Sequence, residues 1–212
     1  MKICGLMRAE DVITCARYGT DIVGFVVEYP HPVPWNLSLN TAKPLVALVK
    51  KPSKTCVVTG GSLEKIIHVA KETKPDYIQL HCGETPAEVG HLVVELGKYG
   101  TKVIKTLFPD TPDLEKAAAD FGALGIYAIL FDPRTPNNAT HGGLADLSVF
   151  AKLKRAASCP VILAGGITPE NVAGLVSASN AQIIDLMSGV ECKRGVKDEA
   201  RIAALFQALR SK

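Results

Sequence analysis

Two residues with acid–base side chains, Cys4 and Asp132, each end a short apolar segment typical of a buried strand. Side chains alternate along an extended segment, so Lys2 and Cys4 share one face and Ile3 lies on the other. A thiolate can serve as a general base and an enclosed carboxyl as a general acid. The alternatives are a small buried thiol at Cys4 and a turn-forming aspartate at Asp132. Together the two residues indicate acid–base chemistry more strongly than either does alone.

Glycine-containing turns follow two later apolar segments and place Gly165, Gly166, Ser188 and Gly189 in loops. Exposed backbone N–H groups in such turns favour a bound anion. Barrel enzymes often hold a phosphate in the loops that follow their last two strands. The double occurrence therefore predicts a phosphate site at these four residues, the alternative being ordinary turn glycines.

Asp185 lies inside the last apolar segment, where a buried carboxylate requires a partner. Lys2 is the expected partner, because the first and last strands of a closed barrel adjoin. Asp185 could then contact the substrate or form only a structural ion pair. His81, which ends another apolar segment, is likewise a candidate for substrate contact or a hydrogen-bonded core histidine.

The histidines and cysteines show no metal-ligand spacing, so we expect neither a metal site nor a disulfide framework. The four histidines other than His81 are scattered: His31, His68, His91 and His141. The six cysteines, among which Cys4 alone is a candidate for chemistry, lie far apart and include no C-x-x-C pair.

The composition is that of a globular protein, with 212 residues that are 47% hydrophobic and 21% charged, which excludes disordered and collagen-like chains. The net charge of +3 is interspersed along the chain, so a nucleic-acid or membrane partner is poorly supported. No apolar run reaches the ~20 residues of a membrane span, and the first residues lack a signal-peptide pattern. We expect a cytoplasmic protein.

Strand-like and helix-like segments alternate along the whole chain. The predicted strands are Lys2–Cys4, Asp21–Val27, Thr55–Thr59, Asp76–His81, Lys102–Leu107, Tyr127–Asp132, Val161–Gly165 and Gln182–Met187. The predicted helices are Ala9–Tyr18, Thr41–Lys50, Leu63–Glu72, Ala87–Tyr99, Asp113–Leu124, Leu144–Ala157, Glu170–Ala178 and Glu199–Leu209.

Eight such units predict an α/β fold, a (β/α)8 TIM barrel whose parallel eight-stranded sheet is closed, as a single domain over residues 1–212. The alternative is an open doubly wound sheet, although the G-x-G-x-x-G turn of such folds is absent. One ambiguity remains in the second unit, where Leu45–Val49 competes with Thr55–Thr59 for the third strand.

Several motifs keep one order and spacing along the chain and resemble those of the phosphoribosylanthranilate isomerase family. The first and last are the most specific, because other phosphosugar barrels share the glycine turns but lack a cysteine at the end of the first strand. The motifs are Lys2–Leu6, Gly24–Phe25, Gln79–His81, Leu163–Gly166, Pro169–Val172 and Asp185–Glu191, followed by Gly195 and Lys197–Asp198.

This resemblance implies an Amadori rearrangement in tryptophan biosynthesis, with no cofactor or metal, acting on a small phosphorylated sugar as a monomer or homodimer. It makes Cys4 the base that removes the C2 proton and Asp132 the acid that protonates the ring oxygen. The residue types fit these roles, because a thiol needs only a modest downward shift of its pKa to act as a base and a partly enclosed carboxyl can hold its proton. His81 and Asp185 would then bind the substrate, Asp185 facing the sugar or the amine, and the glycine turns would hold its 5-phosphate.

The chain departs from the family pattern after the second strand, where the family usually carries an arginine for the anthranilate carboxylate. The segment Tyr29–Trp35 contains no arginine, so His31, Lys105 or Arg134 would have to replace it, and Trp35 could cover an aromatic ring. The glycine loop that follows the acid is also reduced, to His141–Leu147.

These departures leave other functions open. A divergent paralogue could isomerise a related phosphorylated N-glycoside, and a non-catalytic barrel could merely bind a phosphosugar. An aldolase on the same barrel would require an interior Schiff-base lysine, for which Lys105 is the candidate, and an epimerase would require a His/Asp metal cluster.

Overall fold

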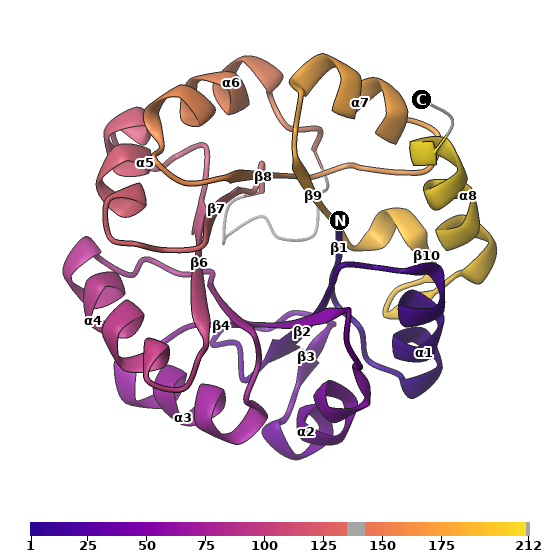
Figure 1. The fold of residues 1–212 in the computed structure, drawn as a ribbon, viewed down its shortest axis with the longest axis horizontal. Coiled ribbons are helices and arrows are strands. Elements are labelled where there is room, and N and C mark those ends of the chain that lie inside the picture. The colour runs from indigo at the N-terminus through magenta and orange to yellow at the C-terminus, as the bar shows by residue number, and fades with distance from the viewer. Residues whose placement is uncertain (135–142, 211–212) are drawn as a thin grey trace.

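The computed structural model describes residues 1–134 and 143–210 and contains a closed barrel of eight parallel strands (Figure 1). The barrel closes at its first strand, because Lys2 pairs with both Ile22 and Asp185. The predicted (β/α)8 fold is thus confirmed, and the open sheet is wrong. The barrel strands are β1 (Lys2–Ile3), β2 (Ile22–Val27), β4 (Lys54–Thr59), β5 (Tyr77–Leu80), β6 (Lys102–Leu107), β7 (Ala128–Phe131), β8 (Val161–Ala164) and β9 (Ile183–Leu186).

Within the described residues, eight α-helices surround the barrel (Figure 1). Side-chain caps fix where several of them begin: the Ser62 hydroxyl accepts a hydrogen bond from the Lys65 N–H, and Thr85 forms a capping box with Glu88. The helices are α1 (Ala9–Tyr18), α2 (Leu39–Leu48), α3 (Leu63–Thr73), α4 (Pro86–Gly97), α5 (Leu114–Gly122), α6 (Leu147–Ala156), α7 (Val172–Ser179) and α8 (Glu199–Arg210).

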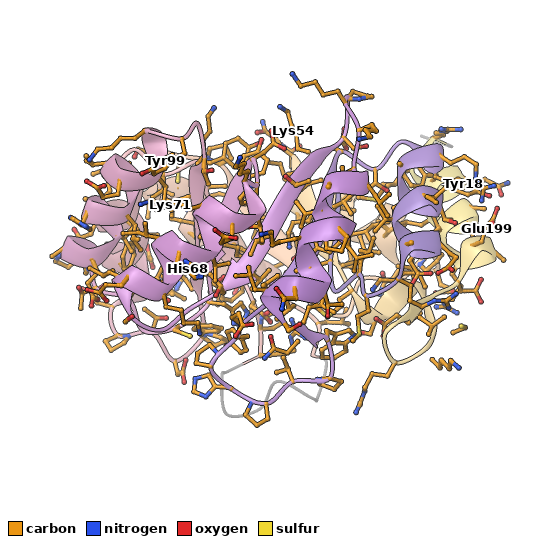
Figure 2. The ribbon with its side chains drawn as sticks, turned by 90° about the horizontal axis from the view of Figure 1, so that it is seen from below. Tyr18, Lys54, His68, Lys71, Tyr99 and Glu199 are labelled. Atoms are coloured by element: carbon orange, nitrogen blue, oxygen red, sulfur yellow. The ribbon has the colours of Figure 1, made fainter. Side chains whose placement is uncertain are left out.

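The first and last helices meet, which closes the outer ring as β1 closes the inner one. The Tyr18 hydroxyl of α1 donates to the Glu199 carboxylate of α8 over 3.2 Å (Figure 2). Arg17 reaches the same carboxylate at 2.7 Å. Both contacts lie at the exposed surface, so each adds at most about 1 kcal/mol to stability.

The second unit resolves the ambiguity between two candidate strands. Leu45–Leu48 belongs to helix α2, whose first residue follows the N-cap Ser38, while β4 forms the strand. Three short strands were not predicted, because two or three residues show no periodicity. These are β3 (Asn36–Leu37), which extends the sheet beside β2, and the antiparallel hairpin of β10 (Glu191–Lys193) and β11 (Val196–Lys197).

The strands present one set of side chains to the helices and another to the barrel interior. Ile3 and Val23 pack in the outer layer, whereas Ile22 and Ile104 pack inside the barrel. Lys2, at the position between Met1 and Ile3, is fully buried in that interior, and Cys4 packs in a cluster at its mouth. The predicted shared face of Lys2 and Cys4 is therefore present.

Candidate active site

A cavity of about 560 Å³, its open mouth included, lies at the carboxyl ends of the strands. All four predicted acid–base and substrate-binding residues line it. Three of the four directly follow barrel strands, namely β1, β5 and β7, and the backbone N–H of each still donates to a residue at the end of an adjacent strand. The four predicted residues are Cys4, His81, Asp132 and Asp185, and the cavity is also lined by Tyr29, Trp35 and Arg134.

The Cys4 side chain is buried in the cavity wall, 2% exposed, and fits there because residue 24 is glycine. A Cβ atom on Gly24 would stand 2.7 Å from the Cys4 Sγ. Burial raises the pKa of the Cys4 thiol, and the nearby Lys2 ammonium opposes that effect without cancelling it. The downward shift of this pKa that a thiol base needs is therefore absent in the substrate-free protein, in which Cys4 is a thiol at neutral pH.

Lys2 and Asp185 form the predicted ion pair, with 2.8 Å between Nζ and Oδ2. Burial would lower the pKa of Lys2, but the Asp185 carboxylate raises it well above the ordinary value. The second oxygen of Asp185, Oδ1, has no hydrogen-bond partner among the described residues. The residue can thus hold Lys2 with one oxygen and offer the other to a ligand in the cavity.

Asp132 is buried, 1% exposed, and both of its oxygens are occupied by Arg134. Nε of Arg134 lies 2.9 Å from Oδ1 and Nη2 lies 2.7 Å from Oδ2. Burial alone would raise the pKa of Asp132, but hydrogen bonds from His81 and Arg134 outweigh it and lower this pKa far below its usual range. The Asp132 carboxyl, which as a general acid must hold a proton, is therefore ionised in the substrate-free protein.

His81 connects the acid to a tyrosine that was not predicted. Its Nε2 lies 3.3 Å from Oδ2 of Asp132, and its Nδ1 lies 3.0 Å from the Tyr29 hydroxyl. That hydroxyl donates its hydrogen bond to the His81 carbonyl oxygen over 3.0 Å. The ring of His81 is fixed between these partners with its edge toward Asp132, so its orientation is set by the fold.

The glycine turns after β8 and β9 lie side by side and line a second cavity of about 750 Å³, its open mouth included. Gly165 and Gly166 adopt φ values of 96° and 60°, which favour glycine. Gly189 approaches the Ile167 carbonyl so closely that a Cβ atom would lie 1.8 Å from that oxygen. Ser188 lines the same cavity. The four predicted phosphate-site residues are therefore brought together.

Two arginines that sequence reasoning did not place in this second cavity also line it. Arg201, in the first turn of α8, donates through Nε to the Gly189 carbonyl over 2.9 Å. Arg134 lines this cavity as well as the first. Its spacing of two residues from Asp132 could have indicated it, whereas nothing near Arg201 in the sequence indicates a role.

The structure distinguishes the three cations expected to replace the missing arginine. Lys105 is outside the site: its Nζ lies 2.7 Å from Glu84 Oε2 and 5.7 Å from the ring centroid of Phe121, in the layer between β6 and the helices. His31 is exposed and does not line the cavity. Arg134 does line it.

The placement of Lys105 also removes it as the candidate Schiff-base lysine, whose side chain would have to lie in the barrel interior. Lys105 alternates along β6 with Ile104, whose side chain packs inside the barrel, so its own side chain leaves on the opposite face. There it donates to the Cys82 carbonyl oxygen and to Glu84, at 2.6 and 2.7 Å. An ammonium held in this way is not a nucleophile.

Trp35 lines the cavity and is anchored by a buried ion pair. Its indole N–H donates to Glu191 over 2.9 Å, and the same carboxylate oxygen accepts from Lys197 at 2.9 Å. The indole ring is thereby fixed in the cavity wall, where it can cover a planar group.

Of the predicted glycine loop, His141 and Gly142 lie outside the described residues, and Gly143–Leu147 leads into α6.

Within residues 1–134 and 143–210, no group of three or more histidine, cysteine, aspartate or glutamate side chains is arranged to hold a metal ion. Among the described helices, none combines the length and apolar character that crossing a membrane requires.

The chain is similar to known proteins along nearly its full length. Residues 1–208 match the family model described as N-(5'phosphoribosyl)anthranilate (PRA) isomerase. The N-(5'-phosphoribosyl)anthranilate isomerase of Methanopyrus kandleri is 33% identical over 220 residues, covering 100% of this chain and 98% of the relative. The crystal structure of phosphoribosyl anthranilate isomerase from Thermus thermophilus superposes with a TM-score of 0.82 at 26% identity, covering 99% of this chain and 98% of that one.

A further solved structure contains a ligand. It is phosphoribosyl anthranilate isomerase in complex with reduced 1-(O-carboxyphenylamino)-1-deoxyribulose 5-phosphate, similar to this chain with a TM-score of 0.77 at 25% identity. The match covers 100% of this chain and 98% of that one.

Proposed function

The chain belongs to the N-(5'-phosphoribosyl)anthranilate isomerase family, and on that premise we propose how its site performs the isomerisation. The substrate is N-(5-phosphoribosyl)anthranilate and the product is 1-(2-carboxyphenylamino)-1-deoxyribulose 5-phosphate, an Amadori rearrangement in tryptophan biosynthesis. One observation carries the proposal: Cys4 and Asp132 line one cavity, and Arg134, Asp185 and Met187 line both that cavity and the one at the glycine turns. A sugar phosphate can therefore occupy both at once.

The proposed chemistry consists of proton transfers alone. Asp132 gives its proton to the ring oxygen as the C1–O bond breaks, which leaves an iminium ion between C1 and the amine nitrogen. The Cys4 thiolate then removes the proton from C2, and the electron pair forms a C1=C2 double bond that neutralises the nitrogen. The enolamine becomes the ketone when its hydroxyl proton is lost and C1 gains one. Groups placed in this way typically contribute 10²–10⁴-fold each.

The remaining site residues are proposed to bind rather than react. The backbone N–H groups around Gly165, Gly166, Ser188 and Gly189 hold the 5-phosphate, with Arg201 as a nearby positive charge. Asp185 offers its unpartnered oxygen to the sugar or the amine. His81, oriented by Tyr29, lies beside the acid and the substrate.

The proposed functional unit is a single domain over residues 1–212, because the cavity takes side chains from the first strand to the last. The proposed location is the cytoplasm, where a soluble phosphorylated sugar is available. No cofactor enters the steps proposed above.

A direct assay tests the function. The purified chain is given freshly formed N-(5-phosphoribosyl)anthranilate, and the loss of the anthranilate fluorescence is followed. We expect a kcat/KM of about 10⁴ M⁻¹s⁻¹ or more, within the ordinary range for enzymes. Absence of turnover, with inorganic phosphate or a phosphosugar still bound, would contradict the proposal and favour a binding protein or another aglycone.

A further inference from the structure

The Arg134 guanidinium binds Asp132, the residue that must act as an acid in the proposed reaction. Its guanidinium contacts both oxygens of Asp132, at 2.9 and 2.7 Å, and its backbone N–H donates to Oδ1 over 3.0 Å. A bidentate arginine stabilises the ionised form of a carboxyl group. The substrate-free protein therefore holds Asp132 as a carboxylate, whereas the first step consumes a proton from it.

The protonation states of Asp132 and Cys4 in the substrate-free protein are those that one turnover produces. After the proposed steps Asp132 has lost a proton and Cys4 has gained one, giving a carboxylate and a thiol. Burial keeps Cys4 a thiol, and Arg134 keeps Asp132 a carboxylate. The next turnover needs no proton from outside, only the transfer of one from Cys4 to Asp132. Displacement of the guanidinium from Asp132 favours that transfer.

The cavity indicates which substrate group can displace it. Among the described residues that line the cavity, Arg134 is the single side chain that is a cation at every physiological pH. The glycine-turn cavity, by contrast, also has Arg201 and backbone N–H groups for the phosphate. An anionic group carried on an aromatic ring beside Trp35 has Arg134 as its partner within the cavity.

We propose that Arg134 is a substrate-responsive positioning residue, which holds Asp132 ionised in the free enzyme and moves to the carboxylate of the bound aglycone. The released Asp132 then takes up the proton that it donates to the ring oxygen. Productive protonation is thus coupled to the presence of the aglycone carboxylate. This inference rests on the proposed function. It explains both the binding of the aglycone carboxylate and the protonation of Asp132 by one exchange of ion-pair partners at Arg134.

An infrared experiment tests the exchange directly. Difference spectra are recorded on enzyme labelled with ¹³C at aspartate, with two ligands: reduced 1-(2-carboxyphenylamino)-1-deoxyribulose 5-phosphate and the same compound without its ring carboxylate. We expect the C=O stretch of a protonated carboxyl with the first ligand only, and its loss in Asp132→Asn. A band with both ligands would mean that the phosphate displaces Arg134, and a band with neither would mean that no exchange occurs. Either result overturns the proposal.

Kinetics supply a second test that a merely structural role would not satisfy. Because a hydrogen bond to a charged group contributes about 1.5–3 kcal/mol, Arg134→Gln should raise KM at least about tenfold. The variant should also bind the two ligands with similar affinity, while its kcat falls far less than its KM rises, since Asp132 is no longer held ionised. Arg134→Lys, which keeps the charge without the planar fork, should recover part of the discrimination.

Arg194 is the alternative partner for the aglycone carboxylate, because it is exposed and its guanidinium lies 5.9 Å from the ring centroid of Trp35. If Arg194→Gln removes the discrimination between the ligands and Arg134→Gln retains it, the carboxylate binds Arg194 and the proposal is wrong. The activity of the wild type distinguishes failure of the ion-pair exchange from failure of the proposed function. Turnover with unchanged discrimination in Arg134→Gln overturns the exchange alone, whereas no turnover by the wild type overturns the function as well.

Discussion

Lys2 and Asp185 lie opposite each other on the two strands that close the barrel, and their side chains form an ion pair of 2.8 Å in its interior. The lysine is fully buried, so its charge is compensated mainly by this carboxylate. The closure of the sheet thereby places a fixed positive charge beside the Cys4 thiol, where it opposes the effect of burial. The ion pair connects the fold to the reactivity of the proposed base.

Removing one partner of this pair should lower both the stability and the activity of the protein. Lys2→Met leaves a buried carboxylate without its cation, which typically destabilises a protein by about 3–5 kcal/mol. It also removes the charge that favours the Cys4 thiolate, so activity should fall in the molecules that remain folded. Urea denaturation and the fluorescence assay measure the two effects. A variant as stable and as active as the wild type would show that the pair has neither role.

The pH dependence of thiol modification should reveal the raised pKa of Cys4. Because burial raises this pKa, only a small fraction of the substrate-free enzyme carries the thiolate at neutral pH, and the rate of alkylation should still be rising at pH 9. The experiment measures iodoacetamide labelling of Cys4 by peptide mass spectrometry. Cys192, which is exposed, serves as the reference within the same chain. A rate at Cys4 that reaches its plateau near neutral pH would contradict the assignment.

Asp132 should stabilise the fold in a manner that depends on pH. Its pKa is lowered in the folded state, so its contribution is present above the unfolded value of about 3.9 and is lost as the pH falls toward the folded value. The difference in unfolding free energy between the wild type and Asp132→Asn should therefore be larger at pH 7 than at pH 3. Denaturant titrations at both pH values measure it, with Asp110→Asn as the exposed control. An equal difference at the two pH values would contradict the assigned ion pair.

Lys105 should behave as a structural residue. Lys105→Met leaves Glu84 buried without its cation and should destabilise the protein by about 3–5 kcal/mol. Borohydride reduction in the presence of substrate should yield no adduct at Lys105, because its ammonium is held by Glu84 and by the Cys82 carbonyl. Mass spectrometry of the reduced protein tests this, and a trapped adduct would restore the Schiff-base alternative.

The close approach of Gly189 to the Ile167 carbonyl should make this glycine irreplaceable. A Cβ at residue 189 would lie 1.8 Å from that oxygen, so Gly189→Ala must move one glycine turn away from the other. We expect weaker binding of inorganic phosphate and a higher KM. Gly174→Ala is the matched control, because a Cβ there meets nothing within 4 Å. Equal phosphate affinity in the two variants would contradict the proposed phosphate site.

The sequence predicts the barrel because each of its eight units contains an apolar strand and a helix with turn or cap residues at its ends. It also predicts the Lys2–Asp185 pair, since closure makes their strands neighbours. The face on which Lys105 lies was not predicted. In the strand Lys102–Leu107 each face carries one lysine beside apolar residues or Thr106, so its pattern does not distinguish the interior from the outer layer.

The protonation states of Cys4 and Asp132 could not be predicted from the sequence, for a different physical reason. They depend on which charges lie within a few ångströms of a buried group, and the residue types alone do not give those distances. Arg134 illustrates this point: its position two residues after Asp132 is visible in the sequence, but the bidentate contact that ionises the carboxyl appears only in three dimensions. Tyr29 and Arg201 likewise reach the site from a loop and a helix with no sequence signal.

The most direct test of the account compares three proteins with N-(5-phosphoribosyl)anthranilate in the fluorescence assay: the wild type, Cys4→Ala and Cys192→Ala. The two variants remove the same chemical group, in one case from the cavity and in the other from the exposed β10–β11 hairpin. We predict wild-type rates for Cys192→Ala and a loss of about 10²–10⁴-fold or more for Cys4→Ala, the contribution of a general base. Turnover by Cys4→Ala within about twofold of the wild type would contradict the role of Cys4 and the mechanism built on it.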